Sequence, residues 1–308
     1  MDSISAWKNF SMGNELNVAG NFLYDGIKSF EDMETLNNTT EIFNFMYYIS
    51  VGVERLQKVV IILGDYEGIT DLDGLVSSIK HHDHVALMDK IRKLYKIELT
   101  NNENAFINLL SNFYNHLRYG RFLLDKIHLD DEKTEFTHFL EKRLGVVKDP
   151  ILEYKNSDKV KKFIGRIIGK ISTELYKLIE IESKRLGIYT YEINYRSKAY
   201  KIFMDKSYDF TLEKLSMKEL IVYLLNGEEL KDFRKGIAVL ESLDLDVHSL
   251  NAMESIFELQ ELTETVESKY QEYFSNSQYK DRNNILNLLT EEGTDWEKVR
   301  SYLSNTKT

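Results

Sequence analysis

The sequence predicts a mainly α-helical protein, and three observations support this prediction. The 308-residue chain contains a single proline, Pro150, where average usage would give roughly 15. Apolar residues recur at three- and four-residue spacing over long stretches, as in amphipathic helices. Short polar segments rich in Asn, Thr and Gly separate these stretches, as the ends of helices require. We therefore expect long helices joined by short turns.

The apolar spacing places several helices before Pro150. The helix predicted over 40–63 is apolar on most sides, so we expect it to be central in the fold. Gly52 lies inside this helix, where glycine is unfavourable, and a close approach of a second helix is the expected reason. The other helices expected in this half cover 14–36, 71–80, 84–96, 103–128 and 130–145.

The segment 148–150 predicts a boundary between two domains, because the residue before a proline disfavours helix. The expected domains are 1–147, a helical bundle, and 148–308, mostly helical. In the second, the alternating segments 187–193 and 199–203 predict one small β-hairpin near 187–204. Its predicted helices cover 157–185, 216–225, 228–242, 250–275, 281–289 and 295–303.

The composition argues against several classes of site. The chain has no cysteine, which excludes disulfides, thiolate catalysis and cysteine-based metal centres. It shows no P-loop, no dinucleotide fingerprint and no H-E-x-x-H zinc motif, so we expect no cofactor and no metal. The N-terminal residues lack the features of a signal peptide, and the longest apolar stretch, 59–63, is too short to span a membrane. We expect a soluble, cytoplasmic protein without a membrane partner.

Charge is distributed unevenly along the chain. The formal net charge is −10, but residues 148–206 hold 14 Lys and Arg against 8 Asp and Glu. Two interpretations remain open: a solvated helix face, or a surface that contacts a polyanion such as RNA. On the second interpretation, the candidate RNA-binding residues are Lys161, Lys162 and Arg166. A tyrosine-rich stretch around Arg196 is a further candidate, because aromatic and basic residues together bind single-stranded nucleic acid, although tyrosine is also a good strand residue.

The main candidate site lies on the helix predicted over 103–128. At about 100° per residue, one arc of a continuous helix would present five polar side chains: Tyr114, Arg118, Arg121, Asp125 and His128. A guanidinium group binds phosphate well, and histidine exchanges protons near neutral pH. Arg121 would therefore grip a scissile phosphodiester, and His128 would move its protons. Arg118 and Asp125 would be supporting charges, and Tyr114 would be an RNA-binding residue. The alternative is structural: the arginines pair with carboxylates, and His128 is favoured by the helix dipole.

Two other clusters have mainly structural interpretations. The segment 81–84 contains three histidines and Asp83, but adjacent histidines seldom reach one metal ion, so a polar loop with a helix N-cap is the better account. Glu54 interrupts the apolar helix 40–63 and could be a buried general base. A paired polar residue is the simpler account, with Lys58, one turn later, as its nearest partner.

Residues 14–128 resemble a HEPN domain, a helical fold found in many prokaryotic defence and toxin ribonucleases. The similar features are the order of the helices, the segment 52–58 with its acidic residue and lysine, the segment 81–84, and Tyr114-Asn115-x-x-Arg118-Tyr119. Active members carry an arginine and a histidine separated by four to six residues. Arg121 and His128, with six residues between them, satisfy this spacing.

The resemblance implies a homodimer that cleaves RNA without a metal, in antiviral defence or a toxin system. It also leaves a second hypothesis open, because many HEPN-like domains are inactive. The chain would then be a non-catalytic helical interaction protein that dimerises or regulates a partner effector or antitoxin. RNA and a second copy of the chain are the expected partners on the first hypothesis.

Overall fold

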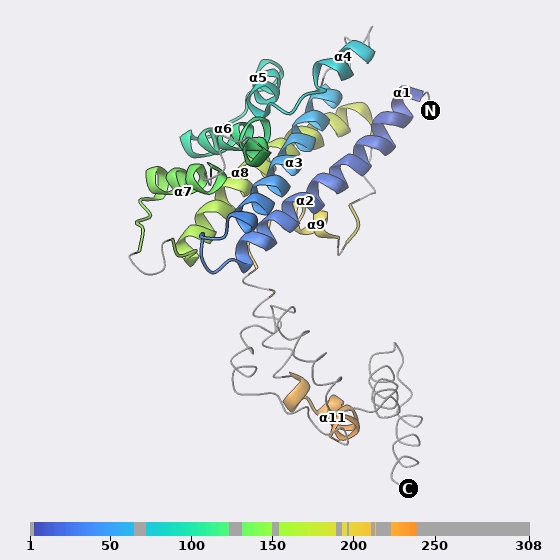
Figure 1. The fold of residues 1–308 in the computed structure, drawn as a ribbon. Helices are drawn as coiled ribbons and strands as arrows, with labels where there is room; N and C mark the ends of the chain where they lie inside the picture. The colour runs from blue at the N-terminus through green and yellow to red at the C-terminus, as the bar shows by residue number, and fades with distance from the viewer. Residues whose placement is uncertain are drawn as a thin grey trace. The chain divides into compact units, whose positions relative to one another are not determined.

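A computed structural model shows that the chain is mainly α-helical, as the sequence predicts (Figure 1). The chain forms two compact units, Met1–Phe210 and Thr211–Thr308. The structure describes residues 3–64, 72–122, 131–149, 154–188, 193–195, 197–210, 213 and 223–238. No sheet occurs within these ranges, and no helix in them is long and apolar enough to cross a membrane.

Helices α2 (Met12–Asp32) and α3 (Thr39–Gly64) pack along each other and confirm the first two predicted helices. α2 ends four residues earlier than predicted because the backbone of 34–36 pairs with another segment. The N–H of Leu36 donates to the carbonyl of Tyr154 over 2.7 Å, and the carbonyl of Glu34 accepts from Asn156 over 2.9 Å. These bonds satisfy backbone groups that would otherwise continue the helix.

Gly52 lies at a close approach of α2 and α3. A Cβ atom added at Gly52 would lie 2.8 Å from the Cγ of Leu23 and 3.2 Å from the carbonyl oxygen of Ala19, both on α2. A side chain does not fit at such distances without a shift of its neighbours. The predicted reason for this glycine is therefore confirmed.

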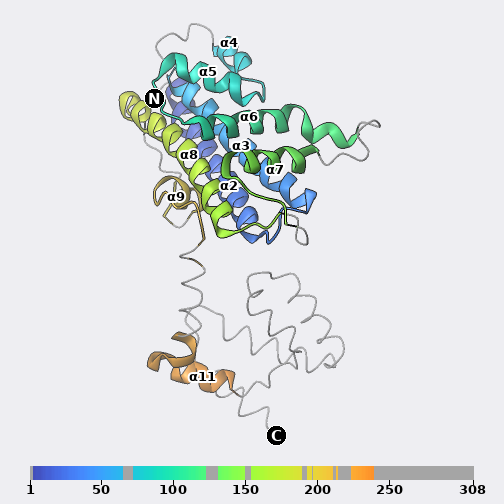
Figure 2. The ribbon, with the colours of Figure 1, turned by 90° about the vertical axis from the view of Figure 1, so that its left-hand side faces the viewer.

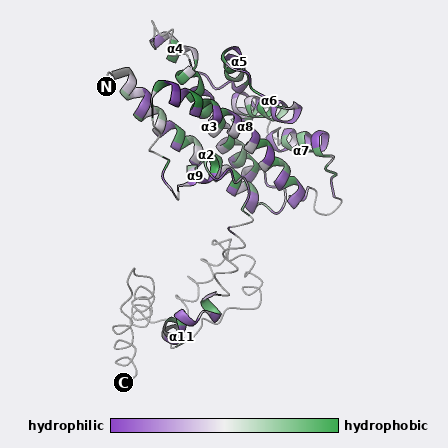
Figure 3. Cartoon of the chain, turned by 180° about the vertical axis from the view of Figure 1, so that it is seen from behind, coloured by the Kyte–Doolittle hydropathy of each residue, from purple (hydrophilic) through white to green (hydrophobic). Residues whose placement is uncertain are grey.

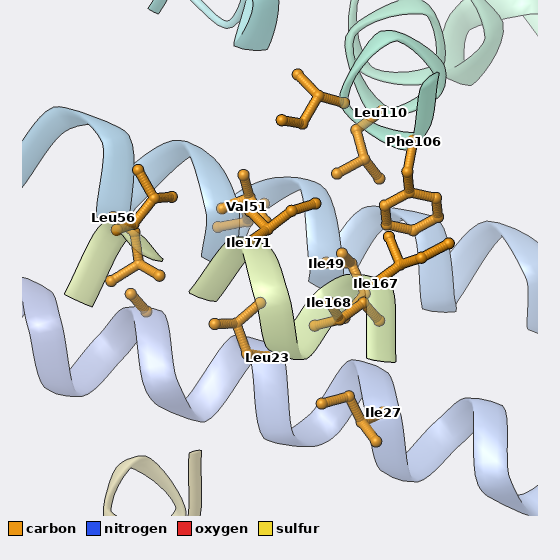
Figure 4. Close-up of a cluster of buried hydrophobic side chains, with 14 of the residues drawn as sticks. Leu23, Ile27, Ile49, Val51, Leu56, Phe106, Leu110, Ile167, Ile168 and Ile171 are labelled. Carbon is orange, nitrogen blue, oxygen red and sulfur yellow. The ribbon is translucent and has the colours of Figure 1, made fainter. Parts of the chain in front are cut away.

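The core of the first unit lies between α2, α3, α6 (Asn101–Asn115) and α8 (Asp158–Leu186). Figure 4 shows Leu23 and Ile27 of α2, Ile49 and Leu56 of α3, and Ile167, Ile168 and Ile171 of α8 directed toward one another, with Phe106 and Leu110 from α6. Both hydrophobic and hydrophilic residues lie along these helices (Figure 3), as amphipathic helices require. Because α8 packs against α3, the first unit continues past Pro150 to Phe210, which differs from the boundary predicted at 147/148.

The helix predicted over 103–128 is not continuous. α6 ends at Asn115, His116 leaves the helical conformation with φ −126° and ψ −56°, and the 3-10 helix η3 (Leu117–Phe122) follows. The side chain of Asn115 donates to the carbonyl of Ser111 over 3.0 Å, which is one way a short polar residue ends a helix. The unbroken helix that the arc of five polar residues assumed is therefore wrong, and two of the five, Asp125 and His128, lie outside the described residues.

The β-hairpin expected near 187–204 is corrected in its second half. Residues Lys198–Phe203 form helix α9, whose N-cap Ser197 accepts a hydrogen bond from the N–H of Tyr200 over 3.1 Å. Ala199, Ile202 and Phe203 are buried, so the apolar spacing is helical rather than alternating. The first expected strand lies mostly outside the described residues.

The remaining helices complete the order along the chain. α5 (His84–Leu94) and α6 lie beside α3, as Figure 2 shows. The other helices of the first unit are α1 (Ser3–Ala6), the π-helix η1 (Trp7–Ser11), α4 (Leu72–Ser78) and α7 (Asp131–Leu144). In the second unit, η5 (Glu228–Leu230) and α11 (Lys231–Ile237) agree with part of the helix predicted over 228–242. The helices predicted beyond 238 fall outside the described residues.

The last residues of the first unit pack closely against α8. The ring of Tyr208 lies over Gly169, where an added Cβ atom would be 2.5 Å from the ring. A Cβ atom added at Gly165 would lie equally close to the carbonyl oxygen of Tyr208. The hydroxyls of Tyr208 and Thr173 are 3.0 Å apart, within hydrogen-bond distance. Burial raises the pKa of Tyr208, with the Thr173 hydrogen bond opposing it. Residues 207–210 are thus a packed part of the unit.

Candidate functional site

Three segments that are distant in the sequence meet around the ring of Tyr114. They are α3, the segment 81–84 before α5, and the junction of α6 with η3. The side chains that meet there are Glu54, Lys58, His82, Tyr114 and Arg118, which we call the Tyr114 cluster. These segments include those that carry the resemblance to HEPN domains.

Glu54 is the buried acidic residue of the cluster. Its side chain is only 9% exposed, and most residues of the surrounding turns of α3 are also buried. Lys58 Nζ donates to its carboxylate over 2.6 Å, so the partner expected from the sequence is confirmed. The carboxylate also lies 3.0 and 3.1 Å from Nδ1 of His82. A buried carboxylate needs such partners to remain charged.

The imidazole of His82 contacts Glu54 through Nδ1, and its second nitrogen, Nε2, has no such contact. Because a carboxylate accepts hydrogen bonds, we assign the proton of the neutral ring to Nδ1, which leaves Nε2 as an acceptor. Within the described residues, Nε2 has no hydrogen-bond partner, and the side chain is 49% exposed. His82 therefore has the arrangement of a general base: one nitrogen oriented by a carboxylate, the other free to take a proton.

Arg118 supplies a positive charge on the same tyrosine ring. Its guanidinium carbon lies 3.7 Å from the ring centroid of Tyr114 and 4.5 Å from that of Tyr119, while the ring of His82 is 4.9 Å from Tyr114. No carboxylate of the described part of the chain pairs with Arg118, and its buried Nε atom has no hydrogen-bond partner there. A guanidinium stacked on aromatic rings keeps its outer N–H groups for an anion.

Tyr114 stays protonated at physiological pH. Burial raises the pKa of its phenol, and the positive charge of Arg118 opposes this rise without cancelling it. Tyr47 stacks on Tyr114 with ring centroids 6.0 Å apart and an interplanar angle of 20°. The ring is thus a rigid platform between His82 and Arg118, with a hydroxyl group that donates hydrogen bonds.

The segment before α5 is fixed by two residues next to His82. Asp83 is the N-cap of α5, accepting from the N–H groups of Val85 and Ala86 and from the hydroxyl of Ser111 over 2.9 to 3.1 Å. Burial acts to raise the pKa of Asp83, but these hydrogen bonds outweigh it and lower the pKa. The N-cap expected within 81–84 is therefore confirmed.

His84 anchors the same segment inside the core. It is fully buried, and its Nε2–H donates to the carbonyl of Ser50 over 2.8 Å. The Gln57 side chain donates to the carbonyl of His84 over 2.8 Å. Burial lowers the pKa of His84, so the ring is neutral in the folded protein at neutral pH. Among the residues described, no group of three His, Asp or Glu side chains is arranged to hold a metal ion.

The predicted catalytic residues are placed only in part. Arg118 belongs to the cluster, and so does Tyr114, which the sequence predicts as an RNA-binding residue. The backbone of Arg121 lies on η3, three residues after Arg118, which is one turn of a 3-10 helix. Asp125 and His128 lie outside the described residues, so their roles stay predictions.

The predicted RNA-binding residues of α8 separate into two kinds. Lys161 is only 17% exposed, and its Nζ donates to the carbonyl of Glu31 on α2 over 2.5 Å. Lys162 and Arg166 are exposed, lie one turn apart, and have no carboxylate partner among the described residues. Lys161 thus joins two helices, while Lys162 and Arg166 are free to meet an anion. Arg196 lies outside the described residues.

Sequence reasoning does not assign His82 to the site. The signal that could have found it is Glu54, because a carboxylate in an otherwise apolar helix requires a polar partner, and helical spacing points only to Lys58. Three histidines within four residues give no indication of which turns inward. In the structure His84 enters the core and His82 faces the carboxylate.

Comparison of the chain with protein-family models, curated proteins and solved structures gave no match. The resemblance to HEPN domains therefore depends on the helix order and on the segments 52–58, 81–84 and 114–119.

Proposed function

We propose that the chain is a metal-independent, RNA-cleaving, HEPN-like ribonuclease that acts through the Tyr114 cluster. The observation that carries the proposal is the half-exposed His82, held by the buried carboxylate of Glu54. It shares the ring of Tyr114 with the guanidinium of Arg118, which pairs with no carboxylate of the described residues. This combination supplies the two things that RNA cleavage without a metal requires: a group that moves a proton and a cation that holds a phosphate.

In the proposed reaction, Nε2 of His82 takes the proton of a ribose 2′-hydroxyl. The 2′-oxygen attacks the adjacent phosphorus, the bond from phosphorus to the 5′-oxygen breaks, and a general acid protonates that oxygen. The products are a 2′,3′-cyclic phosphate and a 5′-hydroxyl. Arg118 would bind the negative phosphate oxygens, and the Tyr114 hydroxyl would donate to them. Glu54 would stabilise the imidazolium that forms.

The arginine and histidine predicted from the sequence, Arg121 and His128, supply a candidate for the general acid. His128, with Arg121, has the arginine-to-histidine spacing of active HEPN domains. The family resemblance also implies a homodimer, which would bring two such sites together. Prokaryotic antiviral defence or a toxin system is the context that this resemblance suggests.

The exposed basic residues of α8 would contact the RNA backbone. Lys159, Lys162 and Arg166 follow one another at three- and four-residue spacing, which places them along one face of the helix, and Lys155 lies just before it. All four are exposed, and none has a carboxylate partner among the described residues. Such a row neutralises successive phosphates of a nucleic acid.

The decisive test measures cleavage of RNA by the full-length chain in EDTA. We expect His82→Gln to lower the rate by roughly 100- to 10,000-fold, the usual contribution of general acid–base catalysis. His81→Gln is the matched control, because His81 lies next to His82 but outside the cluster, and it should retain the rate. Equal rates for the wild type and His82→Gln would refute the assigned role.

Two further results would redirect the proposal. Loss of cleavage in Arg121→Ala and His128→Ala, with His82→Gln unaffected, would assign the chemistry to the pair predicted from the sequence. No cleavage by the wild type at any concentration, together with a stable complex with another protein, would favour the non-catalytic interaction protein. Light scattering on the same samples measures whether the chain is a dimer.

Adjacent lysines on α8 offer a second, matched test. Lys162→Gln should weaken binding of a non-cleavable RNA and reduce the salt dependence of binding by about one counterion, with stability within about 0.5 kcal/mol of the wild type. Lys161→Gln should leave binding unchanged but lower the melting temperature, since it removes the bond to Glu31. The reverse pattern would contradict an RNA contact at Lys162.

A further inference from the structure

Two exposed aromatic residues follow Arg118 on η3. Tyr119 is 52% exposed and Phe122 is 83% exposed, although both are large hydrophobic side chains. In a 3-10 helix, residues three apart lie directly above each other, so the two rings occupy the same side of η3. Neighbouring exposed aromatic side chains are unfavourable in water and commonly mark a binding surface.

The charge next to this aromatic pair indicates what binds there. The guanidinium of Arg118 lies between the rings of Tyr114 and Tyr119, 3.7 and 4.5 Å from their centroids. It has no carboxylate partner among the described residues. An apolar protein partner would leave this charge without compensation, whereas a nucleotide carries a phosphate for the cation and a flat base for the aromatic face.

We infer that Tyr119 and Phe122 form a stacking surface for unpaired bases of the RNA whose phosphate is held by Arg118. The inference extends the proposed function, on which it rests, by specifying single-stranded RNA and the residues that select it. In a duplex the flat faces of the bases are already stacked on each other, so they are not available to an aromatic side chain. The surface would thus select RNA whose bases are unpaired next to the bound phosphate.

The test is direct binding of an RNA that the protein does not cleave. A fluorescent single-stranded oligonucleotide with 2′-O-methyl groups lacks the attacking hydroxyl, and its affinity for the full-length chain is measured by anisotropy. We expect Tyr119→Ala and Phe122→Ala each to weaken binding by roughly 5- to 100-fold, the usual effect of removing one stacked base. Tyr119→Phe should bind like the wild type, because it keeps the ring.

Three controls establish whether the effect is specific to these two rings and to unpaired bases. Phe10→Ala removes another exposed aromatic residue, on η1, and should leave the affinity unchanged. The same sequence as a blunt duplex should bind more weakly than the single strand, and single-stranded DNA tests how far the ribose contributes. Equal affinity of the wild type for single strand and duplex, or unchanged affinity in both alanine variants, would overturn the inference. The inference would also be overturned if the wild type bound no oligonucleotide and the Phe122→Ala variant no longer associated with itself.

Because binding is measured without cleavage, the two proposals fail separately. Normal binding with the expected losses in Tyr119→Ala and Phe122→Ala, but no cleavage of ordinary RNA, supports the stacking surface and refutes the ribonuclease. Normal cleavage with unchanged binding in both variants refutes the stacking surface alone.

Discussion

The two sides of helix α3 are built on different principles. One side carries Ile49, Val53 and Leu56, all fully buried among the apolar residues of the core. The other carries Ser50, Glu54 and Gln57, which are also buried but polar. The apolar side fixes how the helices pack, whereas the polar side fixes where individual groups of 81–84 lie, because each hydrogen bond specifies one atom and one direction.

This difference predicts unequal consequences of mutation. Apolar contacts are numerous and non-directional, so their loss lowers stability throughout the unit. The polar contacts are few, so their loss should affect the position of His82 more than the fold. Three sets of substitutions test this contrast, in order of expected effect on stability.

The largest effect is expected for Ile49→Ala. Ile49 is fully buried and lies against Gly26 of α2, so truncation leaves a cavity and should cost about 2–5 kcal/mol of unfolding free energy. Urea denaturation followed by circular dichroism measures this loss. Ile181→Ala on the exposed face of α8 is the control and should change stability by less than about 0.5 kcal/mol. Equal effects of the two would show that the apolar side does not form the core.

An intermediate effect is expected for Lys58→Met. This change leaves the buried carboxylate of Glu54 with His82 as its remaining partner, and should cost about 1–3 kcal/mol. The ion pair of Lys170 with Glu174 has the same four-residue spacing, but its lysine is more exposed. Lys170→Met should therefore cost no more than about 0.5 kcal/mol. If Lys170→Met lowered the unfolding free energy more than Lys58→Met, the burial of Glu54 would not strengthen its ion pair with Lys58.

The smallest effect is the pH dependence contributed by His84. Burial lowers the pKa of His84 in the folded state below its ordinary value of 6.5, so only the unfolded chain takes up a proton just below that pH. The stability that the neutral His84 contributes is fully present above pH 6.5. It falls as the pH decreases, by at most about 1.4 kcal/mol per pH unit for one proton. His84→Gln keeps a donor for Ser50 and should reduce this slope.

Melting temperatures at pH 7.5 and 5.5 measure this slope. His81 also has a lowered pKa, chiefly from burial and next from Lys90, so some pH dependence should remain in His84→Gln. Asp83, whose pKa is lowered below 3.8, contributes only at more acidic pH. An unchanged slope in His84→Gln would exclude His84 as its source.

Much of the fold follows from the sequence because helix periodicity is a local property. The helices α2, α3, α5, α7 and α8 occur within a few residues of their predicted positions. The predictions are wrong where contacts between distant segments determine the secondary structure. The end of α2 depends on pairing with 154–156, and α9 resembles a strand in sequence because a six-residue segment shows too few turns to reveal its period.

The site is less predictable than the fold. The pairing of Glu54 with Lys58 follows from their spacing, but the contact with His82 joins residues 28 positions apart. The polar arc on the helix 103–128 depended on helical geometry continuing past Asn115, where the structure turns into η3. A break of one residue changes the direction of every later side chain, so the geometry of a predicted helical motif is least certain near a helix end.

The packing of Tyr208 against α8 has a consequence for synthesis of the chain. The glycines that it covers, Gly165 and Gly169, are translated about 40 residues earlier, so this part of α8 stays uncovered while the intervening segment leaves the ribosome. A surface that the folded unit buries promotes self-association while its covering residue is missing. The first unit therefore reaches its final surface only when residues 207–210 have emerged, and a fragment that stops after α8 should aggregate more readily than one that includes them.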